Sequence, residues 1–328
     1  MRRRRFITVL GGAAAWPLAG YAQQPERNPR IGVLVPFSED DQIARAGVTA
    51  FGQGLGRFGW VDGRNIQIDY RFAANDPALF TSYAADLIGL SPHALLASTP
   101  PAVEALRQQT HTIPIVFVLV LDPVGLRIVQ SLARPGGNIT GFGAVDTPIV
   151  GKWLQLLKDI APRVTRVAVI FNPDTQPYAI FFNRALEDAA PSFEVTVLLA
   201  PVHDDTAIEK AVAVQGHEAG GSVICLPDSF TFSHRFAIAA ATARHGLPVI
   251  GLPDLARAGG LMSYWFDPVD VYAQAASYID RILKGANPAD LPVQQPTKYS
   301  LIINLETAKT LGLTVPPSML DLADEVIE

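Results

Sequence analysis

Short apolar runs alternate with longer amphipathic segments along most of the chain. Continuous runs such as Ile31–Val35 are typical of parallel strands covered on both faces, and Asp41–Phe58 has the broad apolar face of a helix. Because each return to a parallel strand needs a right-handed crossover, the pattern predicts open, doubly wound α/β sheets. Strands are predicted at Ile31–Val35, Asn65–Phe72, Ala94–Ala97, Ile115–Leu121, Val167–Phe171, Val195–Leu199, Val223–Leu226, Val249–Gly251 and Lys298–Asn304.

The segments between these strands carry helix signals. Proline suits the first turn of a helix and glycine its end, so Pro77 and Pro268 mark helix starts and Gly285 a helix end. Further helices are predicted at Val103–Gln109, around Phe181–Leu186, at Phe232–His245, from Pro268 to Leu283 and at Glu306–Leu311.

One glycine-rich stretch, Arg134–Val145, divides the alternation into two blocks. Its Pro135, Gly136 and Gly137 stop a helix, and Gly141 and Gly143 let an extended segment bend. The sequence therefore predicts two Rossmann-like lobes joined by a hinge.

Composition fits two folded lobes and argues against nucleic acid as a partner. Of 328 residues, 49% are hydrophobic and 17% charged, which is typical of a globular chain large enough for two domains. Without Arg2–Arg5, in a segment expected to be removed, 22 basic residues face 31 acidic ones. Nucleic-acid binding needs a basic surface that this balance does not supply.

The N-terminus has the features of an export signal over residues 1–22. A basic start, Arg2–Arg5, precedes the apolar segment Phe6–Ala19, which is too short to span a membrane. Small residues at Gly20 and Ala22 predict cleavage after Ala22 and a periplasmic mature protein. The sequence Arg3-Arg4-Arg5-Phe6-Ile7 favours the twin-arginine (Tat) route, with an ordinary Sec signal as the alternative.

Two motifs that suggest chemistry have structural interpretations. Gly54-Leu-Gly-Arg-Phe-Gly59 matches G-x-G-x-x-G, but it lies at the far end of a helix and not in the turn after a strand, where a dinucleotide site needs it. We interpret these glycines as close packing and a helix end. Cys225, the single cysteine, lies in an apolar strand and is expected to be a buried, inert thiol.

No combination of residues predicts catalysis, a metal site or a cofactor. The sequence has no G-x-S-x-G, Walker or H-E-x-x-H motif, and its six histidines are dispersed. Aspartates follow several predicted strands, and ligands in open α/β sheets collect at the carboxyl ends of strands. Each aspartate alone is more often a turn or helix cap, but one cleft between lobes would gather all of them. They are Asp122, Asp174, Asp228 and Asp267.

Several long motifs resemble those of one family. They include Pro114-Ile-Val-Phe117 with Asp122-Pro-Val-Gly125, Ser131–Gly141, Gly259–Tyr264, Leu283–Gln294 and Asn304–Leu313. The chain resembles the ABC-transporter substrate-binding proteins of the tryptophan-binding-like group, which have the type I periplasmic binding-protein fold. One departure is Trp265, where the family usually has glycine after Ser263-Tyr264.

The resemblance implies a monomeric periplasmic protein that captures a small solute between its lobes and delivers it to an ABC permease. It implies a first lobe of residues 30–141 and 264–290, and a second of 142–263 and 291–328. Ser98 and Thr99, at a helix start, are expected to hold an anionic group, with simple N-capping as the alternative. Asp122 and Asp228 are expected to hold a cationic group. The full set of expected contacts is Phe37, Ser38, Ser98, Thr99, Asp122, Phe142, Asn172, Asp174, Asp228, Tyr264 and Asp267.

Two other functions stay open from the sequence. The chain fits a ligand-sensing module for a membrane receptor, and less well an exported enzyme on the same fold, since no nucleophile and base are paired. The solute also stays open, because aromatic and other amino acids, aromatic acids and purine-like compounds fit such clefts.

Overall fold

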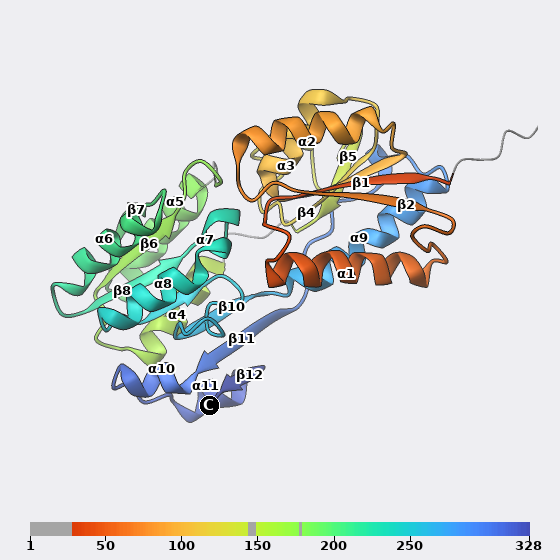
Figure 1. Cartoon of the computed structure of the whole chain (residues 1–328). Helices are drawn as coiled ribbons and strands as arrows, with labels where there is room; N and C mark the ends of the chain where they lie inside the picture. The colour runs from red at the N-terminus through yellow and green to blue at the C-terminus, as the bar shows by residue number, and fades with distance from the viewer. Residues whose placement is uncertain (1–27, 144–148, 177–178) are drawn as a thin grey trace, which may run out of the picture.

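The computed structural model describes residues 28–143, 149–176 and 179–328. Two α/β lobes lie side by side, each built around its own sheet (Figure 1). This confirms the fold class expected from the alternation of strands and helices. The predicted export signal and Val145 lie outside the described residues.

The first lobe contains a fully parallel five-stranded sheet covered on both faces. Side chains alternate along its strands, so Ile31, Val33 and Val35 pack toward α1 and α9, whereas Leu34 packs toward α2 and α3. The strand order is β2 (Gln67–Phe72), β1 (Arg30–Val35), β3 (Ala94–Ser98), β4 (Ile115–Val118) and β5 (Ile139–Phe142). The helices are α1 (Gln42–Arg57), α2 (Pro77–Gly89), α3 (Thr99–Gln109) and α9 (Pro268–Leu283).

The second lobe contains a seven-stranded sheet that is parallel except at one pair. β10 and β11 run antiparallel, which the sequence analysis did not predict. The strand order is β12 (Glu325–Ile327), β11 (Tyr299–Asn304), β10 (Met262–Phe266), β9 (Val249–Gly251), β8 (Gly221–Cys225), β6 (Arg166–Phe171) and β7 (Thr196–Pro201). The helices are α4 (Ile149–Ile160), α5 (Ala179–Ala189), α6 (Asp205–Gly216), α7 (Ser229–Ser233), α8 (Arg235–Arg244), α10 (Leu305–Thr310) and α11 (Pro317–Leu322). Two short 3₁₀ turns, Ala190–Phe193 and Pro288–Asp290, complete the list.

The chain crosses between the lobes three times: from β5 to α4, from β10 to α9, and from the turn Pro288–Asp290 to β11. Two of these crossings are hydrogen-bonded to each other, because Gly143 N donates to Gln294 O (3.0 Å) and Gln294 N donates to Gly141 O (3.0 Å). The hinge is therefore a bundle of segments and not the single glycine-rich connection that the sequence suggested.

Two residues near the hinge belong to the sheet opposite to the one expected. Phe142 is the last residue of β5 in the first sheet, and Tyr264 lies in β10 of the second. Both strands keep their ladder hydrogen bonds past the predicted boundary, and hydrophobic pattern alone does not say which sheet a strand joins.

The contact between α1 and α9 confirms the structural interpretation of the G-x-G-x-x-G motif. A Cβ added at Gly54 would lie 2.7 Å from Ala273 O and 2.8 Å from Ala276 Cβ, so only glycine lets the two helices approach. Gly59 has φ +87° just beyond the end of α1, as expected of a residue that ends a helix. Trp60 Nε1 adds a hydrogen bond to Asp280 Oδ1 of α9 (2.9 Å).

Three element boundaries differ from the sequence prediction for local reasons. β4 ends at Val118, since Leu119 has φ +59° and leaves the extended conformation. α3 begins at Thr99 and not at Val103, because Pro100 and Pro101 fit a first helical turn. The helix predicted at Phe232–His245 is broken at His234 into α7 and α8.

Candidate functional site

The carboxyl ends of strands from both sheets face one another across the gap between the lobes. A narrow pocket lies there, with a cavity volume of about 10 Å³, about enough for one water molecule. The lobes are in direct contact beside it. Its walls come from Thr99, Pro100, Leu119 and Leu121 of the first lobe and from Thr175, Pro227, Asp228, Ser229, Phe232, Trp265 and Phe266 of the second.

Two pocket residues of the first lobe have strained backbones. Thr99 has φ +69° and Leu119 has φ +59°, and a β-branched residue rarely adopts this left-handed conformation. Thr99 follows β3 and Leu119 follows β4, so both lie at strand ends facing the second lobe. Such strain persists only where the surrounding structure maintains it, and it is frequent at ligand sites.

Two buried hydroxyl groups in the pocket have no hydrogen-bond partner within the described ranges. They are Thr99 Oγ1 and Ser229 Oγ, on side chains that are 4% and 1% exposed and come from opposite lobes. Each unpaired buried hydroxyl costs about 1–3 kcal/mol, so native structures retain few of them. A polar group of a solute would satisfy both at once.

Asp228 is a buried carboxylate at the edge of the same pocket. Its described partners are neutral: Oδ1 accepts from Thr175 Oγ1 (2.9 Å) and Thr231 N (2.9 Å), and Oδ2 accepts from Asn172 N (3.2 Å). Burial raises the pKa of Asp228 to about 6, although these hydrogen bonds act in the opposite direction. Asp228 also caps α7 through a capping box with Thr231.

Aromatic rings support the second-lobe wall of the pocket. Trp265 stacks on Trp153 with ring centroids 5.7 Å apart and lies 4.9 Å from Phe266. Trp153 is fixed in turn by a hydrogen bond from Nε1 to Tyr264 O (3.0 Å). The indole of Trp265 is therefore held in place against the pocket.

Two further residues, Ser98 and Cys225, lie buried behind the pocket. Ser98 accepts a hydrogen bond from the Tyr272 hydroxyl of α9 (2.6 Å), and its side chain does not cap α3. Cys225 is buried, as predicted from sequence, and burial raises the pKa of its thiol well above its ordinary range, helped by the nearby Asp228 charge, which disfavours the reactive thiolate.

The residues predicted to contact a ligand divide into two groups. The pocket brings together Thr99 and Asp228, with Ser98 and Asn172 directly behind them. The others have local roles. Ser38 is exposed, and Asp174 is exposed and pairs with His203 (3.0 Å). Asp122 Oδ1 accepts a hydrogen bond from Gly125 N (2.8 Å). Asp267 caps α9 by accepting a hydrogen bond from Val269 N (2.8 Å). Phe37 packs on Phe232, Phe142 on Tyr278, and Tyr264 on Tyr299.

Sequence reasoning missed several pocket residues: Leu119, Leu121, Thr175, Ser229 and Phe232. Ser229 had a usable signal, because it follows Asp228 at a helix start as Thr99 follows Ser98. Leu119 had none, since its left-handed backbone is visible only in three dimensions.

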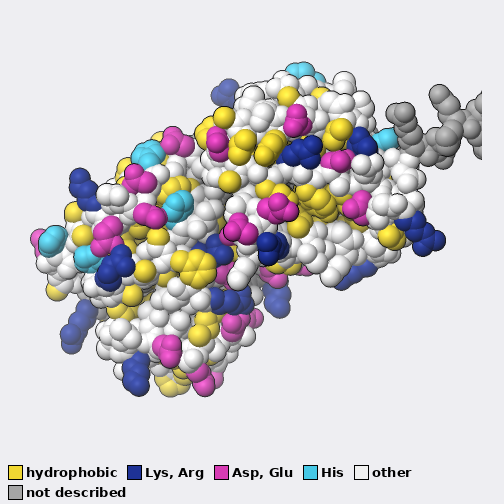
Figure 2. Space-filling model, viewed as in Figure 1, with side chains coloured by type: hydrophobic (Ala, Val, Ile, Leu, Met, Phe, Trp, Pro, Cys, Tyr) yellow, Lys and Arg dark blue, Asp and Glu magenta, His cyan; other side chains and the backbone are white. Residues whose placement is uncertain are grey.

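Within residues 28–143, 149–176 and 179–328, no group of three His, Cys, Asp or Glu side chains is placed to hold a metal ion. No helix in the same ranges has the length and hydropathy of a membrane span. On the face seen in Figure 2, basic and acidic side chains are intermixed over both lobes.

Two α/β lobes with three crossings and a pocket at facing strand ends are the architecture of solute-binding proteins. Residues 30–327 match the family described as ABC transporter substrate binding protein, and the chain belongs to that family. Proteins of this class act outside the cytoplasmic membrane, bind a small molecule and deliver it to a membrane permease.

Relatives agree on class and fold. A tyrosine-binding protein of Clostridioides difficile (strain R20291) is 26% identical over 290 residues, which cover 88% of this chain and 81% of that protein. The structure of an ABC domain from Streptococcus pneumonia in complex with L-Trp is 24% identical, with a TM-score of 0.83, covering 92% of this chain and all of that one.

A third relative is the ligand-free, open structure of a substrate-binding protein with adhesive properties from Clostridium difficile. It is 23% identical, with a TM-score of 0.69, covering 91% of this chain and 99% of that one. Together these neighbours confirm the type I periplasmic binding-protein fold expected from sequence.

Proposed function

We propose that this protein captures an amino acid in the cleft between its lobes and passes it to the permease of an ABC importer. The observation that carries the proposal is the pairing of two unpartnered hydroxyls from opposite lobes, Thr99 and Ser229, with the buried carboxylate of Asp228. Hydroxyl groups donate to a solute carboxylate, and a carboxylate accepts from a solute ammonium.

Closure follows from the placement of these groups. Because Thr99 belongs to the first lobe and Ser229 and Asp228 to the second, one solute contacts all three only when the lobes are together. The solute then stabilises the closed conformation by the difference between its binding free energies to the closed and the open protein. The cavity holds about one water molecule in the conformation described, so a bound amino acid needs the lobes further apart than they stand here. The apolar wall of Leu119, Leu121 and Trp265 then suits an apolar or aromatic side chain. L-Tyrosine and L-tryptophan are the first candidates, since relatives are named for or solved with them.

Calorimetric titration of the mature protein with the standard amino acids, L-tyrosine and L-tryptophan included, tests this proposal. We expect one solute per chain and an affinity about tenfold weaker in Ser229→Ala, the cost of one lost hydrogen bond. Ser82→Ala removes an exposed hydroxyl from α2 and is the matched control. The proposal fails if no amino acid binds, or if Ser229→Ala binds as tightly as the unchanged protein.

We also propose that the protein is a monomer exported to the periplasm through the Tat route and cleaved after Ala22. The support is the Arg3-Arg4-x-Phe-Ile sequence and the small residues before the cut. Replacing Arg3 and Arg4 by lysine is expected to leave the precursor in the cytoplasm, as fractionation and immunoblotting would detect. Normal amounts of mature periplasmic protein from this variant would contradict Tat export.

A further inference from the structure

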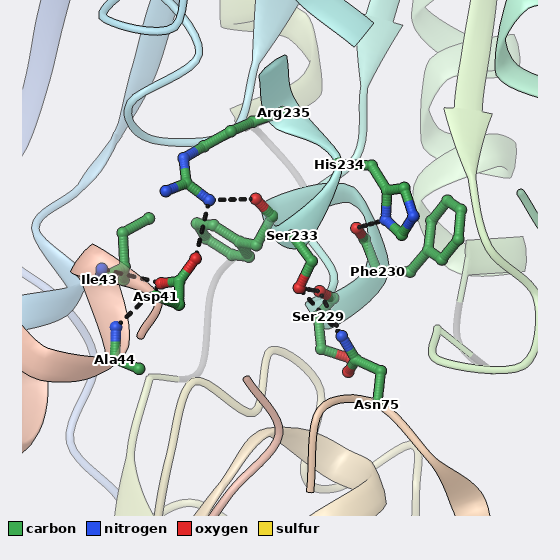
Figure 3. A network of polar contacts seen from close by, with 10 residues as sticks. Asp41, Ile43, Ala44, Asn75, Ser229, Phe230, Ser233, His234 and Arg235 are labelled. Atoms are coloured by element: carbon green, nitrogen blue, oxygen red, sulfur yellow. Dashed lines mark hydrogen bonds and ion pairs between the residues drawn. The ribbon is translucent and has the colours of Figure 1, made fainter. Parts of the chain in front are cut away.

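We propose that the corner between α7 and α8 is a latch that holds the two lobes together before any solute arrives. The latch consists of three contacts made by second-lobe residues 229–235 with first-lobe loops. Figure 3 shows the two polar ones, made by Asp41 and Asn75. It deepens the proposed function, because solute capture depends on the same closure. It concerns the protein without solute, however, and so does not depend on which solute binds.

The first contact is a buried ion pair. Arg235 Nη1 lies 3.1 Å from Asp41 Oδ2, with the two side chains only 6% and 12% exposed. The two oxygens of Asp41 act separately: Oδ1 caps α1 by accepting from Ile43 N (2.8 Å) and Ala44 N (3.1 Å), which leaves Oδ2 for the other lobe. Arg235 Nη1 also donates to Phe232 O (2.6 Å), which holds the guanidinium toward Asp41. Opening the lobes would separate this pair.

The second contact is a pair of hydrogen bonds from a side-chain amide of the first lobe to α7. Asn75 Nδ2 donates to Ser229 O (3.1 Å) and to Ser233 Oγ (3.0 Å). Asn75 has φ +59°, a left-handed conformation that asparagine tolerates, and its N–H donates to Pro36 O (2.6 Å). The loop after β2 is thus fixed in a shape that presents the amide to the second lobe.

The third contact is an apolar one between two buried phenylalanine rings. The rings of Phe37 and Phe232 meet edge to face, with centroids 5.9 Å apart and planes at 81°. They are 1% and 4% exposed, so separation of the lobes would expose both rings to water.

All three contacts are made by groups of the protein itself, and none uses the unpaired hydroxyls of Thr99 or Ser229. The closed conformation therefore has its own stabilisation, and the solute adds to it. Because the latched cavity has room for about one water molecule, a solute enters only after the lobes separate, so the latch also influences the apparent dissociation constant.

Asp41→Asn is the sharpest test, because asparagine still caps α1 but removes the charge that Arg235 needs. Spin labels at Ala85→Cys in α2 and Glu187→Cys in α5, both exposed, report the distance between lobes. Cys225 is buried and does not compete for the label. The protein is unfolded, dialysed and refolded first, so that no solute is carried over.

We expect solute-free unchanged protein to show mainly the short distance, and Asp41→Asn to raise the ratio of long to short distances about tenfold. Arg235→Gln should shift the ratio in the same direction, and the double variant should shift it by less than the two single effects combined, since both remove the same pair. Asn75→Gly keeps the left-handed backbone but lacks the amide, so it should also shift toward the long distance. Glu209→Gln breaks an ion pair with Arg244 inside the second lobe and should change nothing.

A long distance in the solute-free unchanged protein would overturn the latch, and so would variants that match the Glu209→Gln control. Neither outcome depends on solute binding. A protein that is latched yet binds no amino acid would instead refute the proposed function.

Discussion

Asp228 makes the stability of this protein depend on pH in an unusual direction. Burial raises its pKa from 3.8 to about 6, so between these values the folded protein keeps a proton that the unfolded chain releases. The contribution of this group to the free energy of unfolding is therefore fully present below about pH 4. It is lost as the pH rises to about 6 and is constant above. At about 1.4 kcal/mol for each pH unit, the change amounts to about 3 kcal/mol.

Asp228→Asn removes the titrating group and should remove this change. Urea unfolding of both proteins at pH 4, 5, 6 and 7 gives the free energies, and their difference isolates Asp228 from all other groups. The variant also places an amide against Asn172 N–H, which lowers its stability by about 1–3 kcal/mol, but equally at each pH. Relative to the variant, the unchanged protein should therefore lose about 2 kcal/mol between pH 4 and pH 6 and slightly more by pH 7, because the group is only partly titrated at either end of this window.

Ser82→Ala is the control, because it changes an exposed residue of α2 that does not titrate. Its pH profile should run parallel to that of the unchanged protein. If the Asp228→Asn profile is also parallel, the carboxylate is not protonated near pH 6 and the reasoning from burial is wrong.

Three further expectations concern packing, the pocket and chemistry. Gly54→Ala should lower the free energy of unfolding by about 1–3 kcal/mol, because the added Cβ meets α9. Gly52→Ala, whose Cβ meets nothing within 4 Å, should raise the free energy of unfolding by about 0.5–1 kcal/mol. Equal urea midpoints for the two variants would contradict this expectation. Thr99→Val removes an unpaired buried hydroxyl, so it should raise the free energy of unfolding by about 1 kcal/mol while weakening solute binding. Thr140→Val is the contrasting variant: it loses a hydrogen bond to Leu291 O (2.6 Å) and should lower the free energy of unfolding. A bound solute should be released unchanged, as mass spectrometry would verify; steady conversion that a pocket substitution abolishes would mean that the protein is an enzyme.

The fold class was predictable because most strands of the two sheets are compact apolar runs and several helices have their own start or end signals. Ile31–Val35 and Val167–Phe171 were placed to within a residue of β1 and β6 on that basis. The errors occur where local signals compete. Leu119 continues an apolar run but turns left-handed, and the break at His234 lies inside a segment whose composition suits one helix.

The pocket was less predictable, because a carboxylate after a strand serves equally as a cap or as a ligand group. Asp122 and Asp228 both come shortly after an apolar strand, yet one accepts from a turn N–H and the other is buried between the lobes. The unpartnered state of Thr99 and Ser229 depends on what surrounds them and has no sequence signature. The latch pair Asp41 and Arg235 lies 194 residues apart along the chain, a separation that local patterns do not cover.

The helix α9 has a consequence for how the protein is made. It belongs to the first lobe by its contacts with Gly47, Gly54 and Ser98, but a ribosome produces it only after most of the second lobe. Until about residue 283 has been synthesised, the face of α1 that packs on Tyr272 and Ala276 stays uncovered. The first lobe therefore cannot complete its core during translation ahead of the second, and residues 30–143 alone are not a self-sufficient folding unit. Any truncation used to study one lobe must carry α9 with it.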